Sequence, residues 1–176
     1  MKLFSYIVVI ILSISLCGCP YSSAYKLDET PNIYVEDILI GNWACFVKKP
    51  GINKEEPVKM VLSKKNDTEY NIAFTGYLEE LKPFRIISND SIMGTAYMST
   101  LLGRQFLNIE IKSRVYIAEI KFDNNKLSVL PMAEHFTSRM IMSSTALRGM
   151  LEFHYKTRTH PMYDADFCLW DMVKVN

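Results

Sequence analysis

The sequence predicts a mainly β protein: an antiparallel barrel, closed or open, or a sandwich, with one helix before the last strand. Three observations predict this fold class. Short runs of alternating apolar and polar residues recur about every 8–16 residues between polar turns, which is typical of antiparallel sandwiches and barrels. Aromatic residues make up 12% of the chain, and aromatic side chains favour strands. The apolar pattern takes the period of a helix only near the C-terminus.

The strands are expected to follow one another with little more than turns between them. The expected ranges are 38–47, 58–63, 70–75, 83–88, 92–99, 107–112, 115–122, 126–132 and 167–175. The clearest alternation is that of Leu107, Ile109 and Ile111 with the polar residues between them. Alternation places these three side chains on one face of the strand.

A single amphipathic helix is expected at residues 145–156. Leu147, Met150, Leu151 and His154 stand at positions i, i+3, i+4 and i+7, which puts them on one helical face. Ser144 or Thr145 is expected to cap the start of the helix, because a hydroxyl can accept a hydrogen bond from its first turn. A histidine on the apolar face is most simply a core residue.

The N-terminus has the pattern of an export signal. Lys2 is followed by an apolar stretch at residues 3–16, which is shorter than the roughly 20 residues that span a bilayer. The stretch ends in Leu16-Cys17-Gly18-Cys19, which resembles the lipobox of bacterial lipoproteins. The resemblance implies that residues 1–18 are a signal peptide and that Cys19 carries the lipid.

The same resemblance places the protein on a membrane, outside the cytoplasm. Pro20 follows the cysteine where an Asp would direct retention at the inner membrane, so the outer membrane is expected. The polar residues 19–36 are interpreted as a tether, and residues 37–176 as one domain. The chain has 20 Lys and Arg against 19 Asp and Glu, and removal of Lys2 balances them. A balanced chain has no basic excess for nucleic acid.

The tripeptide Gly41-Asn42-Trp43 opens the first expected strand. A Gly-x-Trp at this place, followed by antiparallel strands, a helix and a closing strand, resembles the lipocalins and the small lipocalin-like lipoproteins of bacteria. In lipocalins an Arg at the end of the last strand packs over this Trp, and Lys174 is the only cation in the last expected strand here. Trp43 then either closes one end of the barrel, the favoured interpretation, or lines a ligand pocket.

Two cysteines remain in the domain after lipidation of Cys19. Cys45 lies in the first expected strand and Cys168 in the last, and a closed barrel brings those strands together. In an oxidising compartment this placement predicts a Cys45–Cys168 disulfide, with two separate buried thiols as the alternative.

No residue pattern in the chain indicates catalysis, a metal site or a cofactor. His135, His154 and His160 match no metal-binding spacing, and no Gly-x-Ser-x-Gly elbow or glycine-rich phosphate loop occurs. We therefore expect no enzyme. Four methionines near the helix could contact an apolar ligand, but ordinary core packing is favoured; they are Met132, Met140, Met142 and Met150.

Two functions remain. The first is a structural or interaction protein with a filled barrel, docking another envelope protein. The second is a binding module for a small apolar ligand or lipid in the barrel interior, because an eight-stranded barrel is either just filled or holds one small ligand. In the second case the interior would be lined by Trp43, Phe74, Leu107, Ile109 and Ile111.

Overall fold

The computed structural model describes residues 21–48, 55–76, 91–136, 140–158 and 161–175. The expected signal peptide at residues 1–18, Cys19 and the expected strand at 83–88 lie outside the described residues. The side chains of Lys48 and His135 also lie outside them.

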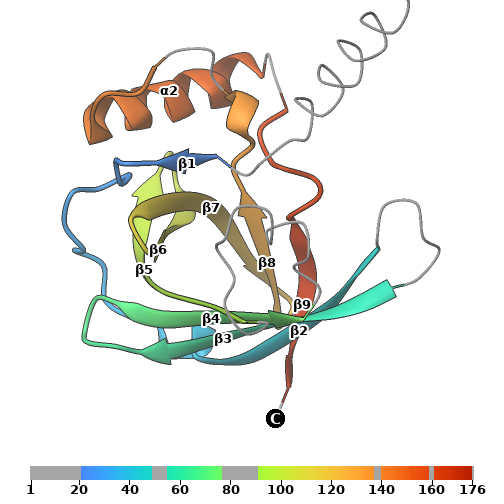
Figure 1. Cartoon of the computed structure of the whole chain (residues 1–176). Helices are drawn as coiled ribbons and strands as arrows, with labels where there is room; N and C mark the ends of the chain where they lie inside the picture. The colour runs from blue at the N-terminus through green and yellow to red at the C-terminus, as the bar shows by residue number, and fades with distance from the viewer. Residues whose placement is uncertain (1–20, 49–54, 77–90, 137–139, 159–160, 176) are drawn as a thin grey trace, which may run out of the picture.

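Within the described residues, eight strands form a closed antiparallel barrel, which confirms the predicted fold class (Figure 1). The strands are β2 (Gly41–Lys48), β3 (Glu55–Lys64), β4 (Tyr70–Gly76), β5 (Ser91–Leu101), β6 (Arg104–Ile111), β7 (Arg114–Asp123), β8 (Lys126–Pro131) and β9 (Leu169–Val175). Each strand pairs with the next along the chain. The last strand, β9, pairs with both β8 and β2, so no edge of the barrel is left open.

Alternation along each strand explains how the barrel is filled. Leu107 on β6 lies between Met98 of β5 and Ala118 of β7, and all three are buried in the interior. The residues between them face outward, so the apolar face of each strand became the inner face of the barrel.

Helix α2 (Ser144–Thr157) covers the outer surface of β5, β6 and β7 and confirms the predicted helix (Figure 1). Its cap is Ser143, one residue before the predicted Ser144, because the Ser143 Oγ accepts from the Ala146 N–H at 3.1 Å. The helix ends at Arg158, whose φ of 50° is left-handed and whose N–H bonds the His154 carbonyl. A second core lies between the helix and the barrel and contains Leu101, Phe106, Ile117, Leu147 and Leu151.

The N-terminal segment is not the free tether that composition suggested. Strand β1 (Ser22–Ser23) pairs with β7 and lies between α2 and the barrel (Figure 1). Leu27 is fully buried beside the helix, and a 3-10 helix, η1 (Asp37–Leu39), places Leu39 in the barrel core. The few apolar side chains of this mostly polar stretch pack against the barrel. The stretch is therefore held in place, although its composition is that of a loop.

Candidate functional site

Trp43 closes one end of the barrel. Its Nε1 donates to the Leu39 carbonyl at 2.8 Å, which fixes the ring beneath η1. The Lys174 Nζ lies 5.4 Å from the ring centroid and donates to the Ile38 carbonyl at 3.3 Å. The cation of the last strand thus lies over the tryptophan ring. This geometry supports the interpretation of Trp43 as a plug.

Gly41 makes this arrangement possible. Its φ of +144° is a backbone conformation that side chains other than glycine rarely adopt. A Cβ at this position would also collide with the Cε of Lys174, which crosses the chain here on its way to Trp43. Both the first and the third residue of the Gly-x-Trp motif therefore serve to close the barrel.

The middle of the barrel is packed with side chains. Met60, Leu107, Ala118, Leu127 and Met172 have no exposed surface at all. Because a cavity that admits a water molecule would expose the atoms that line it, these residues border no such space. Among the buried interior residues exposure reaches 9% at Cys45 and Ile111, and Val47, Phe74 and Tyr116 at the margin of this core are only partly buried.

The five residues predicted to line a ligand site all belong to the interior. Trp43, Leu107, Ile109 and Ile111 are buried in its core, and Phe74 is partly buried against it. Their positions along the barrel differ. Met60 of β3 pairs with both Trp43 and Phe74, so these two lie in one cross-strand row, whereas Ile111 is the last residue of β6. A ligand role for these residues remains a prediction.

The disulfide predicted between Cys45 and Cys168 is not formed in this structure, where both residues are free, buried thiols. The β2–β9 ladder ends with Ala44 opposite Val173, so Cys45 falls next to Met172, and Cys168 lies further back along the chain. Three to four residues of extended chain span roughly 10 Å or more, whereas a disulfide needs Cα atoms within about 7 Å. Burial raises the pKa of each thiol from 9.0 to about 11.

A buried carboxylate lies between α2 and the outer surface of the barrel. Glu119 on β7 is 2% exposed and accepts hydrogen bonds from the hydroxyls of Tyr155, at 2.5 Å, and Tyr163. The Arg104 Nη1 lies 2.8 Å from the other carboxylate oxygen, and its guanidinium lies 4.5 Å from the Tyr155 ring centroid. Burial, together with hydrogen bonding to Glu119, raises the pKa of Tyr163 to about 12. Three segments of chain thus meet at one carboxylate.

Sequence reasoning missed this network. Glu119 stands at an outward position of an alternating strand, where a carboxylate normally faces water. The only feature of the sequence that indicates burial of Glu119 is the apolar face of the helix that covers it. That face does not show which strand the helix covers. The network holds structure together, because each of its polar atoms already has a partner in the described protein.

Asn108 holds the N-terminal segment on the barrel. This buried side chain accepts from the Leu27 N–H at 2.6 Å and donates to the Ser99 Oγ at 2.8 Å. Arg148 of α2 adds an ion pair with Asp28 at 2.5 Å. Side chains of β6 and α2 therefore bind the segment from two sides.

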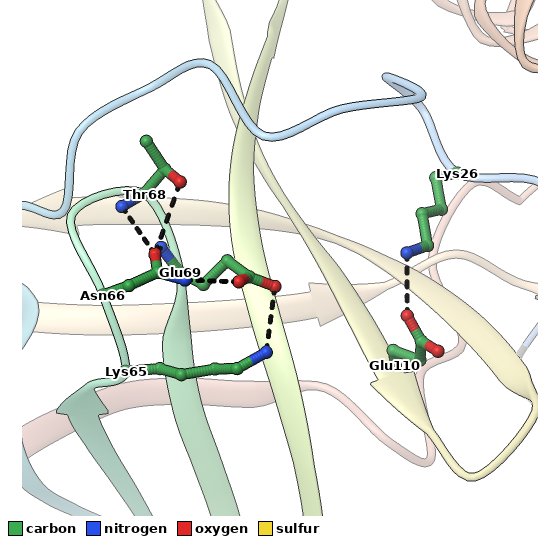
Figure 2. A network of polar contacts seen from close by, with 6 residues as sticks. All are labelled: Lys26, Lys65, Asn66, Thr68, Glu69 and Glu110. Carbon is green, nitrogen blue, oxygen red and sulfur yellow. Dashed lines mark hydrogen bonds and ion pairs between the residues drawn. The ribbon is translucent and has the colours of Figure 1, made fainter.

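Charged side chains at the β3–β4 turn form a second polar network (Figure 2). Asn66 donates to Glu69 at 2.6 Å, and Lys65 lies 3.2 Å from the same carboxylate. These bonds lower the pKa of Glu69, the Asn66 hydrogen bond most of all. Lys26 of the N-terminal segment pairs nearby with Glu110 of β6 at 2.8 Å (Figure 2). Each of these charged side chains is thus paired within the protein.

Strands β2, β3 and β4 lie on the side of the barrel away from α2 (Figure 1). Several apolar side chains of these strands and of their neighbours β5 and β9 are exposed. Cross-strand pairing makes Val61 a neighbour of Ala73, and Ala73 a neighbour of Met93. Val173 lies opposite Ala44 in the next outward row, which continues to Lys59 of β3. We call this surface the bare sheet face; its exposed large residues are Phe46, Val61, Met93, Trp170 and Val173.

The structure describes the side chain of one of the three histidines, His154. Among the described residues, no group of three or more His, Cys, Asp or Glu side chains could hold an ion. His154 is buried on the inner face of α2, with its Nδ1 3.1 Å from the Phe136 carbonyl, as expected of a core histidine. The His135 side chain and His160 lie outside the described residues.

Comparison of the chain with protein-family models, curated proteins and solved structures finds no match in any of the three. Within the described ranges, neither α2 nor a shorter helix has the length and apolar character needed to span a bilayer.

Proposed function

We propose that this protein is a lipid-anchored, non-catalytic interaction protein of the bacterial cell envelope. The observation that carries the proposal is the packed barrel interior, where residues such as Met60, Leu107 and Met172 have no exposed surface. A binding module needs a concave apolar space of at least a few hundred Å³. Tight packing in the middle of the core favours the outer surface of the barrel as the functional surface.

The lipobox-like Leu16-Cys17-Gly18-Cys19 supports the anchor. Together with a second acyl group, a lipid on Cys19 would hold the protein stably on a membrane. The expected location is the outer membrane, with the domain outside the cytoplasm.

The bare sheet face supports the interaction role. Val61 and Met93 are linked across β4 by Ala73, and Val173 lies beside Ala44 in the next row, so apolar residues continue across neighbouring strands of this face. Groups of exposed apolar residues mark interaction surfaces. Phe46 and Trp170 are aromatic, the type of side chain that most often contributes strongly to protein interfaces. The partner we expect is another envelope protein.

The alternative is a binding module for a small apolar ligand. It is favoured by the greater exposure at the margin of the barrel core, where Phe74 and Tyr116 are only partly buried. A ligand would enter there and displace side chains from the core.

Solvent extraction tests the proposal against this alternative. The acyl-free domain, expressed without residues 1–19, is purified and extracted with organic solvent, and fatty acids are titrated while Trp43 and Trp170 fluorescence is recorded. We expect no co-purifying lipid and no saturable change. A lipid recovered in stoichiometric amount, with a saturable change in emission, would establish the binding module instead.

A further inference from the structure

The chain is held by the barrel immediately after the expected anchor. The Tyr21 N–H donates to the Met132 carbonyl at 2.9 Å, and Ser22 and Ser23 pair with β7. Cys19 lies two residues before Tyr21, and two extended residues span about 7 Å. A lipid on Cys19 would therefore hold this part of the barrel close to the membrane surface.

Tyr21 lies beside the C-terminal half of α2. Its ring centroid is 4.9 Å from that of Phe136, in the 3-10 helix η3 (Glu134–Phe136). The Phe136 ring in turn lies 6.3 Å from His154 of α2. These contacts and the position of β1 beneath α2 place the anchored end of the chain on the α2 side of the barrel (Figure 1).

The surface on that side carries apolar side chains outward. Met140 is 86% exposed and Phe153 is 54% exposed, although core packing is predicted for Met140 and Met142. The prediction is wrong for these two because Ile141, between them, packs into the core beneath α2 and alternation turns its neighbours outward. Lys156 and Arg158 are exposed at the C-terminal end of the same helix.

We propose that this surface docks on the lipid bilayer that holds the anchor. We define the membrane-docking face as Met140, Met142, Phe153, Lys156 and Arg158. The inference rests on the proposed lipid anchor at Cys19. Apolar side chains on a helix insert about 5–10 Å into the boundary between headgroups and acyl chains, and Lys and Arg pair with anionic headgroups. The barrel then lies directly on the membrane, with the bare sheet face turned away from it.

Depth-dependent quenching tests the orientation. The full-length lipidated protein is reconstituted in phosphatidylglycerol-containing vesicles with brominated lipid, and a fluorophore is attached to single introduced cysteines. Met140→Cys and Phe153→Cys sit on the membrane-docking face. Met93→Cys and Phe46→Cys are matched controls of the same residue types on the bare sheet face, 73% and 70% exposed in the native protein. The native thiols Cys45 and Cys168 are buried.

We expect quenching at Met140→Cys and Phe153→Cys to be several-fold stronger than at their controls. Equal quenching on both faces, or stronger quenching at Met93→Cys and Phe46→Cys, would overturn the docking face. Labelling with radioactive fatty acid, which should be lost in Cys19→Ser, tests the lipid anchor separately from the docking face. A labelled protein with the wrong quenching pattern overturns only the orientation, whereas an unlabelled wild-type protein removes the anchor and the docking face with it.

Discussion

Glu119 offers the sharpest test of how α2 is held on the barrel. Replacing it with Ala leaves the hydroxyls of two half-buried tyrosines without their acceptor and removes the partner of Arg104. A hydrogen bond to a charged group contributes about 1.5–3 kcal/mol. The Arg104 side chain is 40% exposed, so water screens its ion pair and it adds about 1 kcal/mol at most. We therefore expect Glu119→Ala to lower the free energy of unfolding by about 3–5 kcal/mol.

Replacing the partners of Glu119 should lower the free energy of unfolding by smaller amounts. Tyr155→Phe removes one hydrogen bond and should cost about 1.5–3 kcal/mol, whereas Arg104→Ala should cost about 1–2 kcal/mol, including the loss of its stacking on Tyr155. Glu110→Ala is the matched control, because its pair with Lys26 is 42% and 35% exposed and should contribute less than about 1 kcal/mol.

Urea denaturation of each variant, followed by circular dichroism, measures these free energies. Hydrogen exchange of the α2 amides locates the effect, because loss of the network should release the helix before the barrel opens. The reasoning fails if Glu119→Ala costs no more than Glu110→Ala. It also fails if Arg104→Ala proves the most damaging of the four.

Three further predictions follow from other contacts. Gly41→Ala should lower the free energy of unfolding by about 1–3 kcal/mol, because it forces a side chain into a positive φ. Adding Lys174→Ala should restore only the part of that loss that comes from the collision with the lysine, and thermal unfolding of both variants measures it. Cys45 and Cys168 should alkylate only in urea, as read by mass spectrometry without reductant, and a bridged protein would show no modification. Burial raises the pKa of both thiols from 9.0 to about 11. Below pH 9 the thiols are protonated in the folded and the unfolded chain, so their contribution to stability is intact. Between pH 9 and about 11 only the unfolded thiols ionise readily, and stability should fall. Asn108→Ala should cost about 1–3 kcal/mol and speed proteolysis of the N-terminal segment, because the Leu27 N–H loses its acceptor; unchanged proteolysis would contradict this.

The strands and the helix could be predicted because their patterns are local. Alternation in the Leu107–Ile111 run and helical spacing from Leu147 to His154 each need only a few neighbouring residues. The position of Trp43 also followed from its motif. Here local preference and the final fold agree.

What the sequence could not supply is register and long-range packing. The disulfide prediction assumed that adjacent strands bring Cys45 and Cys168 together, but the ladder places Cys45 beside Met172 instead. The expected tether failed for a related reason. Its polar composition hid Leu27 and Leu39, which reach cores formed by residues distant in the chain. Glu119 is likewise buried only because α2 returns over β7.

Site-specific photocross-linking in cells tests the central claim most directly. A benzoylphenylalanine replaces Phe46 on the bare sheet face or, as the matched control, Phe153 on the opposite side of the molecule. We predict one discrete adduct with another envelope protein from the Phe46 position, lost when Val61→Lys is added, and no protein adduct from the Phe153 position. The same adducts from both positions, or none from Phe46, would contradict an interaction protein that works through its outer sheet.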